Sequence, residues 1–353
     1  MDTDSKQSVS IIDFAEIEED FQSLLKLENL DLAIAERPDR VEDLERTVEN
    51  AIQEAYEEEA SCDEAHLFLQ RVLYQIFRMK LFWYDDFDNY KNEDSAYLFL
   101  LRAKIEGAWQ QWETRQLDLA SFKRGSIEEE LRTRVAKDLN PAPTATERYI
   151  SDEISEAGYR RLLAIASVNG LVEASQLSRM LGGVGNEVQS MLTKIFLEEY
   201  GGGKLARKHS TFFIEMLDSL GMQTQAEAYL DLLPWPTLAN INHSFTLSEK
   251  KRCYLRYVGG LLFTEVTTPA AFKNYKLAGE RIGLNEDSYG YWDLHMKEDE
   301  RHGQWMLDDV ALPLTAQYPE QAWEILMGYE QQRFMNQRAA KAVDESLREA
   351  EEG

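Results

Sequence analysis

Cysteine is nearly absent from this chain: Cys62 and Cys253 are its only two in 353 residues, and they lie far apart. Without a CxxC pair or closely spaced cysteines, neither a disulfide framework nor a cysteine-based redox motif is expected. Long apolar runs are missing too, since none approaches the ~20 residues that span a membrane. The first ten residues are acidic and polar, unlike a signal peptide. We therefore expect a cytoplasmic protein.

Basic residues are too few to balance the acidic ones. The chain has 38 Lys and Arg against 64 Asp and Glu, a net charge of −26. Nucleic acids and anionic membrane surfaces are bound by basic surfaces, so neither is an expected partner. Residues 1–60 alone hold nineteen acidic and five basic residues, which we interpret as a solvated acidic face.

Strand patterns are also missing, because no good run of alternating apolar and polar residues occurs. Proline (8) and glycine (19) are modest in number, and long stretches rich in Ala, Leu, Glu, Arg and Gln favour helix. In residues 66–83 and 97–112 the large apolar residues recur at three- and four-residue steps, which is typical of amphipathic helices. The predicted fold class is all-α.

The predicted organisation is a tail, a helical N-terminal region and a second helical domain. Residues 1–11 are expected to be a disordered tail and residues 12–140 an N-terminal helical region. Pro141 and Pro143 mark a linker, with the boundary near residue 140. The second domain is expected over residues 150–348. Within it, one helix is expected to open at Thr246 after a loop containing His243, and another near Pro269.

The sharpest local signal is a polar stripe between residues 295 and 302. On a helix, Asp299 lies at ~+40° and His302 at ~−20° from His295, so all three point from one face. Two imidazoles and a carboxylate are expensive to bury as plain core but are good metal donors. The alternative is an exposed polar face. Trp292 and Trp305 lie close by, which argues against full exposure.

A second signal is the pair Glu199 and His209, separated by three glycines at 201–203. In an unbroken helix these residues would be ~15 Å apart along the axis, too far for one metal site. The glycines permit a break that folds His209 back beside Glu199. The alternative is an ordinary helical turn with exposed polar residues, and Glu198 competes with Glu199 for the carboxylate role.

Two further glutamates stand in apolar surroundings. Glu265 lies among the small and apolar residues 260–266, where an unpaired buried carboxylate would be costly. Metal binding would neutralise it, but an ion pair with Arg256 or a helix-capping role is the alternative. Glu173 is the one acid at the start of a small, apolar helix, where a favourable position near the helix dipole is the alternative.

Together these signals give seven candidate ligands. Four carboxylates balance the charge of two ferrous ions, and oxygen donors with imidazole suit iron or manganese better than zinc. Helical bundles build such sites from facing helices. Either Glu265 or Glu199 could bridge the ions or shift to open a coordination position, and these are the candidate catalytic residues. The candidate metal ligands are Glu173, Glu199, His209, Glu265, His295, Asp299 and His302.

The segments GLVEAS, LEEYGGGKLARKHSTFF, GGLLFTE and LHMKEDERHGQW resemble the heme-oxygenase-like di-iron oxidases and oxygenases, also called iron-containing redox enzymes. The resemblance covers residues 150–335, and all seven candidate ligands match places in the family's pattern. It implies a seven-helix bundle like that of heme oxygenase, two Fe(II) ions per domain, and reaction with O2. Implied reactions on a small organic substrate are N-oxygenation, desaturation and oxidative C–C cleavage. It also implies that the N-terminal helical region helps form a homodimer.

Two other interpretations remain open. Heme oxygenase would need an early proximal histidine, but the first histidine after residue 150 is His209, and thiaminase-type chemistry would need a nucleophilic cysteine, for which Cys253 is the candidate. Alternatively, the acidic N-terminal helices could belong to a non-catalytic interaction or scaffold protein that keeps a vestigial metal site.

Overall fold

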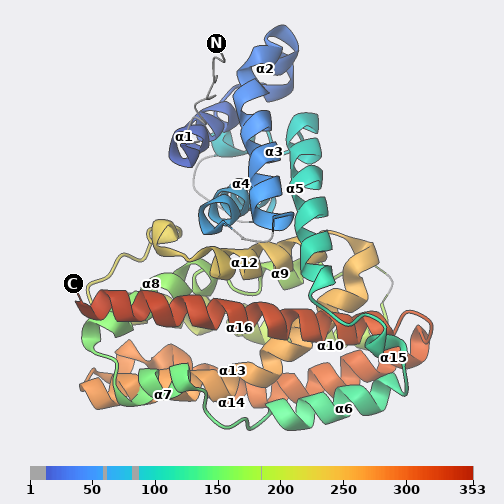
Figure 1. Ribbon diagram of the computed structural model, residues 1–353. Helices are drawn as coiled ribbons and strands as arrows, with labels where there is room; N and C mark the ends of the chain where they lie inside the picture. Colours follow the sequence, from blue (N-terminus) through green and yellow to red (C-terminus); the bar gives the residue numbers. More distant parts are fainter. Residues whose placement is uncertain (1–12, 59–61, 82–86, 184, 353) are drawn as a thin grey trace, which may run out of the picture. The chain divides into compact units, whose positions relative to one another are not determined.

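A computed structural model describes residues 13–58, 62–81, 87–183 and 185–352 of the chain (Figure 1). The side chains of Leu81 and of residues 297–300 lie outside this description, as does the predicted tail at residues 1–11. Every regular element in the described residues is a helix, which confirms the predicted all-α class. No described helix combines the length and the apolar character needed to cross a membrane.

The chain divides into two compact units, Met1–Trp112 and Glu113–Gly353. In the first unit, α1, α3 and α4 pack around a core that includes Phe21, Val48 and Phe68. Its α-helices are α1 (Phe14–Leu25), α2 (Leu30–Glu36), α3 (Glu42–Tyr56), α4 (Asp63–Leu81) and most of α5 (Ala96–Arg115). The division differs from the boundary expected near residue 140, because the helix before that point, α6 (Ile127–Asp138), packs against α13 (Tyr254–Ile282) and α16 (Trp323–Glu352) of the second unit.

The second unit is built around α13 (Tyr254–Ile282) and α16 (Trp323–Glu352), which lie side by side, with α12 (Trp235–Ser248) packed on α16 and α14 (Gly290–Trp305) on α13 (Figure 1). A Cβ on Gly259 would lie 2.0 Å from the Ile325 carbonyl oxygen, and one on Gly328 would lie 2.0 Å from the Arg256 carbonyl oxygen. These glycines therefore allow the two backbones to touch. The other α-helices are α7 (Ala145–Asp152), α8 (Glu156–Gly170), α9 (Ser175–Ser178), α10 (Glu187–Glu199), α11 (His209–Ser219) and α15 (Leu312–Gln317).

Two expected helix starts were wrong. Pro236 stands in the first turn of α12, so this helix already includes His243 and ends at Ser248 instead of beginning at Thr246. Pro269 lies inside α13 and does not begin a helix. A proline there has no N–H to donate, so the carbonyl of Glu265, four residues earlier, loses its helical hydrogen bond. The helix continues because both of its faces are covered, by α14 and by α16.

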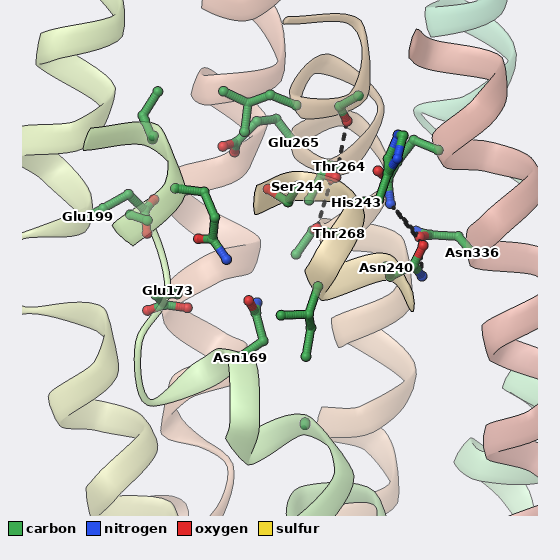
Figure 2. A pocket seen from close by; sticks show the side chains of 18 of the residues that line it. Asn169, Glu173, Glu199, Asn240, His243, Ser244, Thr264, Glu265, Thr268 and Asn336 are labelled. Atoms are coloured by element: carbon green, nitrogen blue, oxygen red, sulfur yellow. Dashed lines mark hydrogen bonds between the residues drawn. The ribbon is translucent and has the colours of Figure 1, made fainter. Parts of the chain in front are cut away.

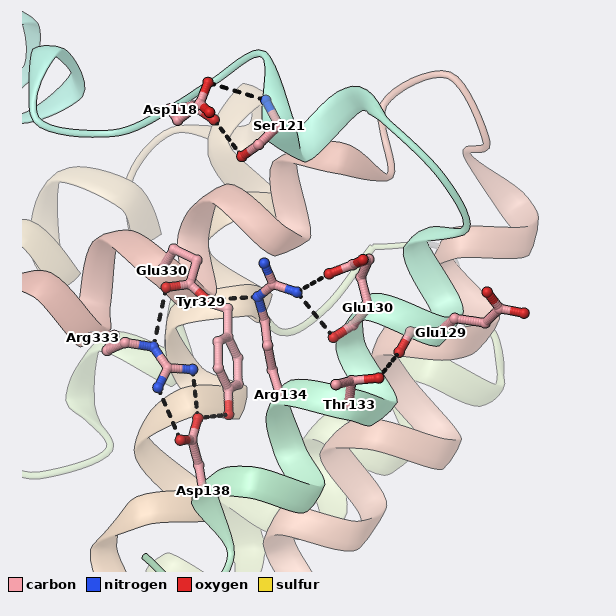
Figure 3. A network of polar contacts seen from close by, with 10 residues as sticks. All are labelled: Asp118, Ser121, Glu129, Glu130, Thr133, Arg134, Asp138, Tyr329, Glu330 and Arg333. Carbon is pink, nitrogen blue, oxygen red and sulfur yellow. Dashed lines mark hydrogen bonds and ion pairs between the residues drawn. The ribbon is translucent and has the colours of Figure 1, made fainter.

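A buried ionic network joins α6 to α16 (Figure 3). The guanidinium of Arg333 donates to both oxygens of Asp138, at 2.9 and 2.6 Å, and the hydroxyl of Tyr329 donates to Asp138 at 2.7 Å. Beside it, Arg134 donates to Glu330 at 2.5 Å. Because the Asp138 carboxylate is buried, it and Arg333 compensate each other's charge, and Tyr329 depends on it as an acceptor.

We predict that Asp138→Ala lowers the free energy of unfolding of the second unit by about 3–5 kcal/mol, because Arg333 and Tyr329 lose their shared buried acceptor. Urea denaturation followed by circular dichroism measures this loss. Glu129→Ala, at an exposed position on the same helix, is the matched control and is expected to change stability by less than about 0.5 kcal/mol. Equal stabilities of the two variants would contradict the role given to the network.

Candidate metal centre

The structure brings six of the seven candidate ligands into one buried group. Glu173 lies in the turn between α8 and α9, and the others come from the end of α10, the start of α11, the middle of α13 and two turns of α14. The side chain of Asp299 lies outside the described residues, so its role stays a prediction. The six side chains that converge are at most 9% exposed and are Glu173, Glu199, His209, Glu265, His295 and His302.

The glycine turn between α10 and α11 places His209 against Glu199. Gly201, Gly202 and Gly203 all have positive φ (60°, 63° and 79°), and a Cβ on Gly201 would lie 2.4 Å from the Arg207 carbonyl carbon. Only glycine adopts this reversal without strain. As a result the first residue of α11 faces the last residue of α10, with His209 Nδ1 2.9 Å from Glu199 Oε2.

Four of these residues form a tight subgroup, which we call the histidine-pair cluster: Glu173, Glu199, His209 and His295. One donor atom from each lies within 4.8 Å of all the others. His209 Nδ1 is 3.0 Å from His295 Nε2, which in turn is 3.7 Å from Glu173 Oε2. Two ring nitrogens at this distance from each other and from carboxylates could share one cation.

The orientation of His295 suits metal binding. Its Nδ1 is 3.0 Å from the backbone carbonyl of Tyr291, one turn earlier on α14. Donation of the Nδ1 proton to this carbonyl leaves the lone pair on Nε2, which faces the cluster. Burial lowers the pKa of His295 to about 4, so the ring is neutral near pH 7. The hydroxyl of Tyr291 donates to Glu173, so this residue orients a second member of the cluster.

His302 lies on the other side of Glu199. Its Nδ1 is 3.4 Å from Glu199 Oε1 and 3.4 Å from Glu265 Oε2. Glu199 therefore turns one carboxylate oxygen toward His209 and the other toward His302. We call Glu199, Glu265 and His302 the His302 group. The geometry thus contains two adjacent sets of donors that share one carboxylate.

Glu198, the rival of Glu199, has a different position. Its Oε2 is 3.1 Å from His302 Nε2, the ring nitrogen that points away from the His302 group, and 3.2 Å from Arg301. A carboxylate that accepts the far N–H of a ligating histidine fixes its ring and makes it a stronger donor. Glu199 therefore lies within the His302 group, whereas Glu198 contacts the opposite side of the His302 ring.

The donor set fits a hard or borderline cation. Burial of three neighbouring carboxylates is costly unless positive charge compensates them. Burial by itself would raise the pKa of Glu199, but the hydrogen bond from His209 and the nearby imidazoles lower the pKa below its ordinary value. Oxygen and imidazole donors without a thiolate suit iron or manganese. The residues are therefore compatible with the metal that the sequence predicts.

The backbone around the site departs from regular geometry in two places. Ala174, next to Glu173, has a φ of 61°, which is rare for a residue with a side chain. After α14 the chain forms a π-helical segment, Met306–Ala311, which begins four residues after His302. Strained residues and π-helical turns are frequent at functional sites.

A cavity of about 340 Å³ adjoins the carboxylates (Figure 2). In Figure 2, Glu173, Glu199 and Glu265 lie on one side of it, whereas Asn240, His243 and Asn336 lie on the other. The two asparagines come from α12 and α16, and nothing in the local sequence pattern links them. His243 was expected in a loop, but it is 1% exposed and lines the cavity from α12.

Comparisons with known proteins agree with this site. A curated relative, the nitrosourea synthase of Streptomyces achromogenes subsp. streptozoticus, is 29% identical over 167 residues, which are 47% of this chain and 35% of that enzyme. The chain thus matches about a third of the relative's length. Residues 160–333, which include all seven candidate ligands, match the family described as iron-containing redox enzymes. This segment, just under half of the chain, is therefore similar to the iron-containing redox enzymes.

Proposed function

We propose that this chain is a non-heme di-iron oxidase or oxygenase that uses O2 to oxidise a small organic substrate. The observation that carries the proposal is the position of Glu199, whose two oxygens face two separate sets of donors. One carboxylate that serves two sets of ligands is what a pair of neighbouring metal ions requires. N-oxygenation, desaturation and oxidative C–C cleavage all remain candidate reactions, and the name of the relative, a nitrosourea synthase, favours N-oxygenation.

Each ion has its own proposed ligands. Glu173, His209 and His295 would hold one Fe(II), Glu265 and His302, with the predicted ligand Asp299, would hold the other, and Glu199 would serve both. When bound, the two ferrous ions supply electrons for the reduction of O2. Glu199 and Glu265 are the proposed catalytic residues, because both would hold an ion and both line the cavity.

The surrounding residues orient the ligands. Tyr291 supports Glu173 through its hydroxyl and His295 through its carbonyl, and Glu198 accepts a hydrogen bond from His302. At Glu265 the helix lacks one backbone hydrogen bond because of Pro269, which lowers the cost of a local adjustment there. Apolar side chains such as Leu177 and Phe272 line the cavity beside the site and limit access of water.

No described contact supports the heme oxygenase, thiaminase or scaffold interpretation. His209 faces Glu199, so it is engaged in the carboxylate group and is not the isolated axial ligand that heme needs. Cys253 is buried in the core around α13 and is not among the residues that line the cavity. A scaffold protein with a vestigial site has no reason to keep costly buried carboxylates together.

We predict that Glu199→Gln abolishes binding of both ions and the reaction with O2, because it removes the charged carboxylate that the two sets of donors share. Iron is measured by mass spectrometry after anaerobic loading with Fe(II), and the reaction by stopped-flow absorbance after mixing with O2. Glu187→Gln, at an exposed position on the same helix, is the control. Wild-type iron content and an unchanged absorbance transient in Glu199→Gln would contradict the proposal.

Each of the two ions can be removed separately by a substitution in its own set of ligands. We expect His209→Ala and His302→Ala each to lower the iron content from about two ions to about one per chain, because each histidine belongs to one set only. Mössbauer spectra of the ⁵⁷Fe-loaded variants distinguish the remaining ions, and the two spectra should differ. If both variants lost all iron, or if both kept two ions, the assignment of the histidines to separate ions would be wrong.

A further inference from the structure

The side of the cavity away from the carboxylates is lined by three amides, which we call the amide cluster: Asn240, Gln332 and Asn336. Asn240 Nδ2 donates to Asn336 Oδ1 at 3.0 Å, and Gln332 Nε2 donates to the same oxygen at 2.8 Å. Gln332 Nε2 also lies 3.4 Å from Asn240 Oδ1. The three side chains, from α12 and α16, therefore hold one another in fixed orientations at the cavity wall.

The amide cluster keeps one donor and one acceptor for a ligand. Among the described residues, the Asn336 NH2 group donates no hydrogen bond and Gln332 Oε1 accepts none. Both belong to part-buried side chains that line the cavity. A neighbouring NH2 donor and carbonyl acceptor are complementary to a group that carries both, as a carboxamide does.

This part of the cavity is electrically neutral. No lysine or arginine occurs among the described residues that line the cavity, and its only acids are the three glutamates of the candidate metal centre. His243 also lines it, and burial, assisted by the charges of Arg256 and Arg338, lowers its pKa to about 3, so its ring is uncharged. A carboxylate or an ammonium group placed here would lose hydration without an oppositely charged side chain on this side of the cavity wall to pair with it.

We propose that the amide cluster binds an uncharged, carboxamide-type group of the substrate, whose remaining part extends toward Glu199 and Glu265. This assignment of substrate class rests on the proposed function, because it takes the carboxylate side as the place of oxidation. The neutral amide wall then selects against acids and amines of the same size, and the cavity of about 340 Å³ restricts the substrate to a small molecule.

The test uses three probes of one skeleton: hexanamide, hexanoate and hexylamine. Each is titrated into the full-length, metal-free protein and into the zinc-loaded protein, and binding is followed by ligand-observed NMR. We expect hexanamide to bind at least about tenfold more tightly than hexanoate or hexylamine in the zinc-loaded protein, because a charged head group cannot be compensated at the amide cluster. Equal or tighter binding of either charged probe would overturn the proposal.

Two substitutions at one position locate the binding group. Asn336→Leu keeps the approximate size, removes the donor, and should weaken hexanamide binding by about three- to tenfold. Asn336→Asp introduces a negative charge and should make hexylamine the preferred probe, a gain that misfolding cannot imitate. Gln337→Leu, at the exposed neighbouring position of α16, is the control. An unchanged probe preference in Asn336→Asp contradicts the assignment.

Measuring iron binding as well as probe binding shows which of the two proposals fails, the substrate class or the di-iron function. Neither Asn336 variant alters a candidate ligand, so each should bind iron as the unmodified protein does. Normal iron binding without a preference for hexanamide would refute the substrate class and leave the di-iron proposal intact. A preference for hexanamide in a protein that takes up no iron would refute the di-iron proposal and leave the amide cluster as a binding site.

Discussion

The buried carboxylate of Glu199, held between His209 on one side and His302 on the other, is the interaction on which the site depends. Two features of the chain produce it. The glycine turn at 201–203 returns the backbone so that α11 starts against the end of α10. The seven-residue spacing on α14 then brings His295 and His302 to the two sides of this carboxylate. Without the turn, each histidine would face an incomplete set of donors.

The rest of the bundle stabilises an arrangement that is unfavourable by itself. Neighbouring buried carboxylates repel one another and lose hydration, and bound cations would offset this unfavourable free energy. Close backbone packing at Gly259 and Gly328 makes the α13–α16 pair rigid, and the network around Asp138 fixes α6 on α16. The site thus combines a rigid frame with local irregularity at Glu265, where Pro269 removes a helical hydrogen bond.

The sequence predicted the all-α class and the residues of the buried group, because both produce patterns within short segments of the sequence. Periodic apolar residues indicate helices, and His295 and His302 recur on one helical face. The start of α12 and the continuity of α13 were missed, because Pro236 and Pro269 are tolerated where first-turn position or tertiary packing compensates. The amide cluster could not be predicted, since its members lie on two helices whose pairing depends on the folded bundle.

Diffraction from crystals of the Fe(II)-loaded protein, measured on both sides of the iron absorption edge, can locate the ions directly. We expect two anomalous peaks about 4 Å apart, one beside His209 and His295 and one beside His302, with Glu199 contacting both. A single peak at a distance from Glu199, or none in protein that carries iron in solution, would contradict this expectation.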